Sequence, residues 1–418
     1  MNTSIFDKYP LPHPYNVKEK IESGMRLPFD LHDELDLIFP NQAFKKNYNV
    51  LIVGCGYNEA IFHSLRNPKF KFTAIDISSS VIDSNLNQIK DYNIKNLKIH
   101  NIDLLDFDDN EFDIIIIMDF ISYHKDPPHV LKHISSLLSD NGVILANVLS
   151  SYYFQQVNII RDVLLNLGYS YDSDEDINEA FDFIKKLDNL HPSRIALLDF
   201  VRGQVDPNTF IDIRDFTIRY LNDSIHYFSV NELFDLFKKS NVFFQGWYSN
   251  SLYYPSANFK KSFMPSFIDR LKGKSLTDQW NNVCNINSPY NGHSKHLFCL
   301  SKNESNLFLQ HELMKDHNTF LNTRKYQSYK QSKGVGTSFI LSANRKMMLS
   351  DDEDSIYRLL ESPRSIDYIL NSDEIDLDKE KRELIITNFF ESVSISRKEI
   401  VSKFLYNEID EYTTSVYN

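Results

Sequence analysis

The 418-residue sequence predicts an α/β protein: a doubly wound sheet of seven strands, with a helical insertion and a small C-terminal module. Three observations support this prediction. From 49 to 148, short apolar runs alternate with stretches whose apolar residues recur every three or four positions. From 151 to 227 the sequence reads as helices only, and from 228 the alternation resumes. Because such alternation is typical of parallel strands covered on both faces, we expect one sheet interrupted by an insertion.

Five apolar runs predict the central strands of the sheet. The runs are 50–54, 72–77, 97–103, 112–119 and 142–148. Between them lie sequences with helical periodicity, which predict the helices that connect one strand to the next. The chain enters the fifth run through Asp140, Asn141 and Gly142, residue types that favour a turn after a helix.

The second part of the sheet domain begins with a predicted helix start. Ser229 and Glu232 have the spacing of a capping box, in which each side chain bonds the backbone of the other residue. Later apolar runs predict the last two strands, with mixed loop and helix sequence between them. We expect the insertion to form a lid over the substrate. The last strands are 242–249 and 295–302, the sheet domain is 49–150 and 228–303, and the insertion is 151–227.

Residues 304–418 predict a separate C-terminal module. A polar sequence that reads as a linker helix leads into two short strand-like runs and three short helical stretches. We interpret this pattern as a winged-helix-like domain, a type of module that often binds DNA. Residues 351–354 and 373–378 are rich in acid. We therefore expect the module to bind protein or to pack on the rest of the chain.

Composition excludes several classes of function. The formal net charge is −12, from 45 basic and 57 acidic residues, which argues against nonspecific binding to nucleic acid. No segment approaches the roughly 20 apolar residues of a membrane span, and the first residues do not resemble a signal peptide. Three scattered cysteines and 13 histidines without ligand spacing predict no metal site and no disulfide framework. We expect a cytoplasmic protein.

The chemically informative stretch follows the first strand, where Gly54 and Gly56 flank Cys55. Glycine lets the backbone turn tightly and lets a ligand lie against it. Asp76 ends the second strand, 20 residues after Gly56, where a carboxylate can accept two hydrogen bonds from a ribose diol. Asp103 ends the third strand and can accept from the exocyclic amine of adenine. The alternative is that each acid caps the following helix, but with the glycines the two acids favour an adenosyl ligand.

These motifs together resemble the class I S-adenosylmethionine-dependent methyltransferases. VLIVGCGYNEA is similar to the glycine motif of that family, AIDIS to its ribose-binding acid and NIDLLDF to its adenine-binding acid. The run 112–148 is similar to its fourth and fifth strands. The resemblance implies a Rossmann-like fold, S-adenosyl-L-methionine as cofactor and S-adenosyl-L-homocysteine as product. It implies cofactor contacts from Gly54, Cys55, Gly56, Asn58, Asp76, Ile77, Asp103, Leu104 and Met118.

One position departs from the family pattern. Asn58 stands where the family usually carries a third glycine. Asparagine tolerates a positive φ better than most residues, so we expect the loop to keep its shape. Contacts to the methionine end of the cofactor are the ones that this change affects.

The chain is also similar, more weakly, to a bacterial group of methyltransferases with a methyltransferase regulatory domain, which includes protein-lysine methyltransferases. The similarity lies in the insertion, in HYFSVNELFDLFKKSNVFFQGW and in the winged-helix-like tail. KYPLPHPYNV stands where that group has a segment near the cofactor, but lacks the arginine and tryptophan of that segment. The resemblance implies that 1–48 packs near the cofactor site and that a protein lysine accepts the methyl group.

Candidates for the chemistry lie just after the fourth strand. The sequence there has no Asn-Pro-Pro-Tyr, which disfavours methylation of amides and exocyclic base amines. Asp119, Tyr123 and His124 can hydrogen-bond an acceptor or take its proton at the substrate mouth. The alternative for His124 and Asp126 is that they only shape a turn before the next helix. Positioning supplies most of the acceleration in an in-line methyl transfer.

Two other functions remain as alternatives. A regulatory protein that binds S-adenosylmethionine without transferring the methyl group would carry the same motifs. An NAD-dependent oxidoreductase also has a GxG turn and an acid 20 residues later, but Asn58 and the acid on the third strand disfavour it. For a methyltransferase, the acidic charge favours a protein or a cationic small molecule as acceptor over nucleic acid. The aromatic excess leaves room for a homodimer interface.

Overall fold

The computed structural model divides the chain into two compact units. The first unit consists of Met1–Pro28, Asn47–Phe244 and Cys284–Asn303, and the second of Phe29–Lys46, Gln245–Val283 and Glu304–Asn418. The sequence 245–283, which we assigned to the sheet domain, therefore groups with the tail. The structure describes residues 5, 8–9, 15–25, 27–38, 45, 47–188, 191–192, 211–248, 252–259, 265–288, 294–304, 320–323, 328–331, 338–342, 345–360, 362–391 and 395–398.

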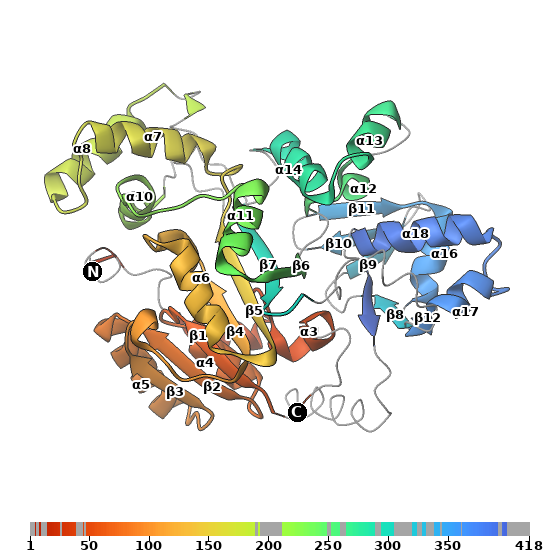
Figure 1. Cartoon of the computed structure of the whole chain (residues 1–418), viewed down its shortest axis with the longest axis horizontal. Helices are drawn as coiled ribbons and strands as arrows, with labels where there is room; N and C mark the ends of the chain where they lie inside the picture. The colour runs from red at the N-terminus through yellow and green to blue at the C-terminus, as the bar shows by residue number, and fades with distance from the viewer. Residues whose placement is uncertain are drawn as a thin grey trace. The chain divides into compact units, whose positions relative to one another are not determined.

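A mixed sheet with the strand order β3-β2-β1-β4-β5-β7-β6 runs through the first unit, and β6 continues into the second (Figure 1). The strands are β1 (Asn49–Val53), β2 (Lys71–Asp76), β3 (Leu97–Asn101), β4 (Phe112–Met118), β5 (Leu138–Leu149), β6 (Phe243–Trp247) and β7 (Lys295–Ser301). Neighbouring strands from β3 to β5 are parallel, and β7 is antiparallel to β5. β4 is buried up to its last residue, which explains its continuous apolar run. The predicted fold class is confirmed.

Helices connect the strands as the periodicity predicts. The connecting helices are α4 (Glu59–Arg66), α5 (Ser79–Asp91), α6 (Pro127–Ser136) and α11 (Val230–Ser240), with 3₁₀ turns at η1 (Leu104–Asp106) and η2 (Phe120–Tyr123). α4 contacts α5, and α6 contacts α11. The predicted capping box is present at the start of α11, where Ser229 and Glu232 exchange side chain–backbone hydrogen bonds.

The turn predicted at 140–142 is wrong. β5 begins at Leu138, so these three residues lie inside the strand. The pairing of β4 with β5 shifts register between Phe112 and Ile114, which marks an irregularity of the ladder. A Cβ on Gly142 would lie 2.7 Å from the carbonyl oxygen of Phe112. The glycine therefore allows two strands to approach closely, and it does not reverse the chain.

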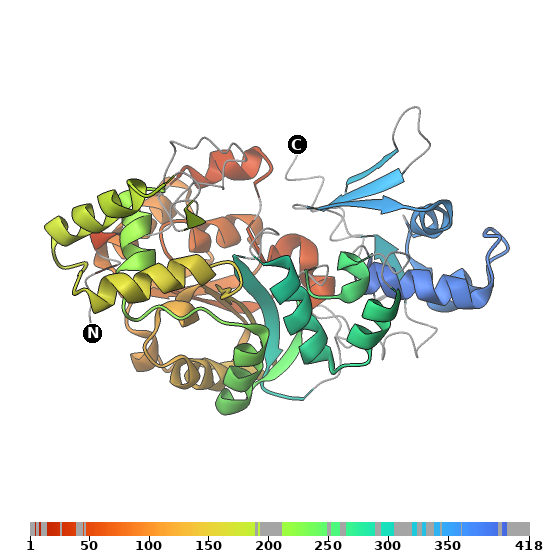
Figure 2. The ribbon, with the colours of Figure 1, turned by 90° about the horizontal axis from the view of Figure 1, so that it is seen from above.

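The insertion folds as helices, which lie together in both views (Figures 1 and 2). The described helices are α7 (Gln155–Asn166), α8 (Asp174–Lys185) and α10 (Ile213–Tyr220), and 193–210 lie outside the described residues. The apolar core of this group includes Leu149, the last residue of β5, and Tyr123 packs against it. The insertion therefore packs against the carboxyl ends of β4 and β5. That edge is where open α/β sheets bind ligands.

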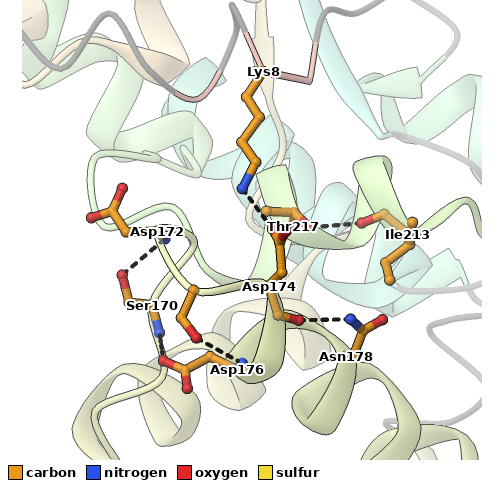
Figure 3. A network of polar contacts seen from close by, with 9 residues as sticks. Lys8, Ser170, Asp172, Asp174, Asp176, Asn178, Ile213 and Thr217 are labelled. Carbon is orange, nitrogen blue, oxygen red and sulfur yellow. Dashed lines mark hydrogen bonds and ion pairs between the residues drawn. The ribbon is translucent and has the colours of Figure 1, made fainter.

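The N-terminal segment contacts both the insertion and the sheet domain. Ile5 belongs to the apolar core of the insertion. Lys8 Nζ forms an ion pair of 2.7 Å with Asp174 at the start of α8 (Figure 3). Tyr15 donates its backbone N–H to Asn58 Oδ1 over 3.3 Å. These contacts bring the segment beside the loop that follows β1.

The tail confirms part of the prediction and corrects another part. Three helices and two strands lie where we expect them: α16 (Asp351–Leu359), α17 (Ile366–Asn371), α18 (Lys379–Glu391), β10 (Ser338–Ser342) and β11 (Arg345–Leu349). The predicted linker helix is wrong where the structure describes it, because β8 (Phe320–Thr323) and β9 (Ser328–Gln331) lie there. β8 pairs with β12 (Arg364–Ser365) and β13 (Ile395–Lys398), and long-range pairing of this kind overrides local periodicity. The two sheets, β11-β10-β9 and β12-β8-β13, leave the winged-helix comparison unconfirmed.

The second unit also contains helices from outside the tail. These are α3 (Leu31–Ile38), α12 (Pro255–Asn258), α13 (Pro265–Lys272) and most of α14 (Leu276–Asn287). Among the described residues, no helix combines the length and the apolar character that crossing a bilayer requires. The same residues contain no group of three or more His, Cys, Asp or Glu side chains placed to hold a metal ion.

Candidate active site

The loop after β1 needs glycine at two positions. Gly54 and Gly56 have φ values of +63° and +53°, in the left-handed region that side chains disfavour. The backbone N–H groups of Gly54 and Cys55 both donate to the carbonyl oxygen of Ile75, which ties the loop to β2. A Cβ on Gly54 would lie 2.9 Å from the ring of Phe120. The loop is therefore a tight connection between β1 and the start of α4, packed against the residue that follows the tip of β4.

Asn58 stabilises the loop through a side-chain hydrogen bond and not through the positive φ that we expected. Its φ is −134°, so the third position of the motif requires no positive φ here. The side chain is buried, and its Oδ1 accepts a hydrogen bond from the backbone of Tyr15. The expectation of a left-handed asparagine is wrong. The side chain instead attaches the N-terminal segment to the loop, a contact that glycine cannot make.

Asp76, at the end of β2, holds the loop with both carboxylate oxygens. Oδ2 accepts from the backbone N–H of Gly56 over 3.1 Å, and Oδ1 accepts from that of Ser78 over 2.9 Å. Ser78, not Asp76, is the N-cap of α5. The next residue, Ile77, is a partly exposed apolar side chain beside the strand tip. The carboxylate therefore sits at the expected place for a ribose contact and also organises the glycine loop.

Asp103 has the capping role that we considered as the alternative. It is the N-cap of η1, and its Oδ1 accepts from the backbone N–H of Leu105 over 2.8 Å. Among the described residues, no further hydrogen bond to this carboxylate is present. Leu104 beside it is buried. A cap that uses one oxygen leaves the other for the adenine contact proposed from the sequence.

Asp119 follows β4 in a strained backbone conformation, with φ at +59°. Its backbone N–H donates to Asn147 Oδ1 over 2.5 Å, and its Oδ2 accepts from Lys295 Nζ. Asp119 Oδ1 and Asn147 Nδ2 are buried, and neither has a hydrogen-bond partner among the described residues. A buried acceptor and a buried donor that lack partners are each costly unless a ligand or water bonds them. The residue is thus held at the site edge with unused hydrogen-bonding capacity.

Three residues of this site were missed by the sequence analysis: Glu59, Lys295 and Asn147. Glu59 is the first residue of α4, directly after the glycine loop, and its side chain is only 15% exposed. Burial and the nearby Asp119 carboxylate raise the pKa of Glu59 to about 8, although the Lys295 ammonium opposes the shift. An acid directly after the glycine motif was a visible signal. Lys295 is 176 residues from Asp119 in the sequence, and no local pattern indicated that the two would meet.

Tyr123 and His124 are at the expected edge, but their surroundings limit their chemistry. Burial raises the pKa of Tyr123, and the Asp119 carboxylate raises it further, so at neutral pH the phenol can donate a hydrogen bond but cannot act as a phenolate base. His124 Nδ1 accepts from the backbone N–H of Asp126 over 3.0 Å, and Asp126 caps α6. Burial lowers the pKa of His124, against the effect of Asp103. The turn that we considered as the alternative for His124 is therefore formed.

The remaining predicted residues are close to the loop. Cys55 is buried, and burial raises the pKa of its thiol well above the usual range, so it fills space beside the loop as an unreactive thiol. Met118 is the last residue of β4. Because the strand order is β3-β2-β1-β4, the tips that carry Asp103, Asp76, Gly54 and Asp119 are consecutive along one edge. The predicted residues therefore form one row.

The comparisons with known proteins agree with this geometry. Residues 51–144 match a family model described as a methyltransferase domain. The structure of PKMT2 from Rickettsia typhi is similar over 90% of this chain and 77% of that chain, with a TM-score of 0.58 and 14% identity. A structure of PKMT2 in complex with AdoHcy is similar over 89% and 76%, with a TM-score of 0.57 and the same identity. At this identity the likeness establishes the fold.

Sequence relatives match parts of the chain. Uncharacterized protein RP789 from Rickettsia prowazekii is 26% identical over 184 residues, which cover 43% of this chain and 31% of that protein. A ubiquinone biosynthesis O-methyltransferase from Coxiella burnetii is 26% identical over 130 residues, which cover 31% of this chain and 55% of that enzyme. The chain therefore spans less than two thirds of the length of these relatives.

The strand order, the loop after β1 and the family match define a methyltransferase domain with the class I fold. The chain therefore contains a methyltransferase domain, and the cofactor of class I methyltransferases is S-adenosylmethionine. The residues present fit that cofactor. Two left-handed glycines let a ligand lie close to the backbone, and Asp119 Oδ1 and Asn147 Nδ2 offer an acceptor and a donor that are unused in the described part of the chain.

Proposed function

We propose that this protein transfers a methyl group from S-adenosylmethionine to an amine, and that the amine is a lysine side chain of a protein. One observation carries the proposal. Asp76, which holds the loop after β1, lies at the tip of β2, and Asp119, which pairs with the Lys295 ammonium, follows the tip of β4; these two strands flank β1. A cofactor bound along the row of strand tips would then extend toward Asp119. The acceptor would approach from the side of β4 and β5.

The roles of the cofactor-side residues follow from their positions. S-adenosylmethionine supplies an electrophilic methyl group on a sulfonium. In the proposal, Asp76 accepts from the ribose hydroxyls, Asp103 accepts from the adenine amine, and Ile77 offers apolar surface to the adenine ring. Gly54 and Gly56 let the backbone run close to the ligand. Binding and orientation by these groups supply most of the acceleration that an in-line transfer needs.

Asp119 supports an amine as acceptor. Its carboxylate already holds an ammonium, that of Lys295. A residue that binds one alkylammonium is chemically suited to bind another, and the net charge of −12 favours the approach of a cationic substrate. Asp119 would orient the incoming amine, and Tyr123 would donate a hydrogen bond beside it. A general-base role for Asp119 or His124 belongs to the same proposal.

The insertion is suited to cover this site and to select the acceptor. Its apolar core takes in Leu149 at the end of β5 and contacts Tyr123. Arg161 Nη1 on α7 donates to the carbonyl oxygen of Ile225, which holds the returning chain against the helices. A cover of this kind excludes water from the sulfonium and restricts which acceptors can approach. We propose that 151–227 is the substrate lid.

Calorimetric titration with S-adenosylmethionine, S-adenosylhomocysteine and NAD tests the proposal, followed by transfer of labelled methyl groups to lysine-rich proteins. We expect the first two ligands to bind, NAD to fail, and label to appear as methyl-lysine after acid hydrolysis. Binding without transfer to any amine would favour the regulatory alternative. NAD binding in the absence of adenosylmethionine binding would overturn the proposal.

A further inference from the structure

We propose that Glu59, Asp119 and Lys295 form a site that lacks one positive charge, and that a cationic group of the cofactor completes it with release of a proton from Glu59. The inference rests on the proposed function, since it needs S-adenosylmethionine to bind. It goes beyond that function because it assigns to two residues outside the expected motifs a role in recognising charge. Two chemical groups could supply the cation, the sulfonium and the α-ammonium.

The charge count of the cluster is the first step. Asp119 and Glu59 contribute two carboxyl groups, and Lys295 contributes one ammonium, which pairs with Asp119 Oδ2. The second oxygen of Asp119 is buried without a partner in the described part of the chain. If Glu59 were ionised, the cluster would carry a net negative charge in a poorly solvated place. The protein avoids this charge by keeping Glu59 protonated.

Among the described residues, the charged and titratable groups that interact with Glu59 include no cation besides Lys295. Those on the elements around it are Asp119, Lys295, His63, Tyr15 and Cys55. His63 Nε2 lies 4.0 Å from Glu59 Oε1, one helical turn along α4. Burial and Arg66 lower the pKa of His63 to about 3, so this imidazole is neutral at physiological pH. Tyr15 and Cys55 are neutral as well, because the pKa values of both are raised.

The position of Glu59 relates the cluster to the cofactor. It directly follows Asn58 at the end of the glycine loop, and Gly54 in that loop lies against Phe120, the residue after Asp119. A cofactor on the loop therefore brings its methionine end near both acids. A cation there stabilises the carboxylate of Glu59 relative to its acid form, so binding the cation and losing the proton are linked. Affinity for a cationic ligand must then rise with pH below the pKa of Glu59.

Three ligands distinguish the two sources of the cation. S-adenosylmethionine carries both the sulfonium and the α-ammonium, S-adenosylhomocysteine keeps only the ammonium, and 5′-methylthioadenosine has neither. Their affinities for the full-length protein are compared at pH 6.0 and 7.0. Both values lie below the ordinary pKa of an α-amino group, about 7.7–8.0, so the ligands do not titrate.

Release of one proton raises affinity about ten-fold over this interval. We expect that rise for S-adenosylmethionine and no change for 5′-methylthioadenosine. A rise for S-adenosylhomocysteine as well assigns the cation to the α-ammonium, and a constant affinity assigns it to the sulfonium. An unchanged affinity for S-adenosylmethionine, or an equal rise for the neutral ligand, overturns the inference. If neither S-adenosyl ligand binds at either pH, the proposed function fails and the inference fails with it.

Glu59→Gln tests whether Glu59 is the source of the proton. The variant keeps the shape of the side chain and removes its titration, so the pH dependence should disappear. Glu175→Gln, on the exposed first turn of α8, is the matched control and should keep it. A Glu59→Gln protein that retains the full ten-fold rise contradicts the assignment. If the variant does not fold, calorimetry of the unmodified protein in two buffers of different ionisation enthalpy still counts the protons released, and a count of zero overturns the proposal.

Discussion

The candidate active site has two acidic centres, Asp76 and the pair Glu59 and Asp119, which differ in how their oxygens are hydrogen-bonded. Asp76 accepts backbone hydrogen bonds with both oxygens, from Gly56 and Ser78. Glu59 and Asp119 lie close to each other, have one ammonium between them, and leave a buried oxygen unpaired among the described residues. The first centre is complete before any ligand binds, and the second is not.

The two centres should therefore respond differently when a ligand binds. A carboxylate satisfied by fixed backbone donors costs little to keep ionised, so it can receive a ribose without rearrangement. A pair of crowded carboxyls stores electrostatic free energy that a cation can release. We therefore expect the Asp76 centre to contribute constant affinity, and the Glu59 and Asp119 centre to contribute affinity that depends on charge and pH.

The largest expected effect is that of Asp76→Ala on cofactor binding. The variant loses a charge-assisted contact to the ribose and also the acceptor that holds Gly56. We expect a loss of about 2–4 kcal/mol in affinity for S-adenosylhomocysteine, measured by calorimetry. Asp83→Ala, on the exposed face of α5, is the control. If Asp76→Ala binds as tightly as the parent protein, the ribose assignment is wrong.

Glu59→Gln should change how stability depends on pH. The pKa of Glu59 is about 8 in the folded state and near 4.5 when unfolded, so the folded protein binds the extra proton. The contribution of this group to stability is present below pH 4.5 and is lost as pH rises through 8. We expect the variant to be more stable than the parent at pH 9, where the parent has lost this contribution, with little difference at pH 4.5. Urea unfolding at both pH values measures this, and equal stability at pH 9 would contradict the buried, crowded environment.

Gly54→Ala separates backbone strain from steric contact in the cofactor loop. Its left-handed φ and the contact of a new Cβ with the Phe120 ring should together destabilise the protein by about 2 kcal/mol. Gly168→Ala is a matched control, because Gly168 also has a positive φ, +88°, but nothing lies within 4 Å of its added Cβ. Thermal unfolding should show the larger loss for Gly54→Ala. Equal losses would mean that the Phe120 ring moves aside without cost.

The smallest effect is expected for Asp103→Ala. One hydrogen bond to a neutral amine is at stake, worth about 1–2 kcal/mol of cofactor affinity. Asp103→Asn keeps one oxygen for the cap to Leu105 but replaces the other by an amide NH2, so it should keep the stability of the parent and bind adenosine as weakly as the alanine variant. Titration with adenosine compares all three. If Asp103→Ala loses stability but no affinity, the residue is a cap and not an adenine contact.

The sequence was most informative for features that residues close together in the chain determine. The β1 loop with its two glycines and the acids at the ends of β2 and β3 were all read from short patterns, because strand, turn and helix alternate locally. The capping box at Ser229 and Glu232 was predictable for the same reason. Asn58 shows the limit of this reading. Its position was predicted, but its conformation depends on Tyr15, a contact between segments that no local pattern encodes.

Other expectations failed where distant strands determined the outcome. The stretch 140–142 contains turn-forming residues, yet it lies within β5. The neighbouring β4 pairs with β5 on both sides of this stretch, and the register shifts between Phe112 and Ile114. Part of the predicted linker helix became β8, because it pairs with strands about 40 and 75 residues further along the chain. The free-energy difference between helix and strand that local propensity provides is smaller than the free energy gained from burial and strand pairing in a sheet.

From the amino-acid sequence alone we could predict the doubly wound sheet, its first five strands and a row of candidate cofactor-binding positions at the ends of those strands. Those features follow from hydrophobic periodicity and from the connection of each strand tip to the next helix. The ion pair of Lys295 with Asp119 and the burial of Glu59 beside them could be recognised only in the folded structure. The reason is physical: the charge state of a buried acid depends on which distant groups surround it and exclude water, and sequence separation contains no information about either.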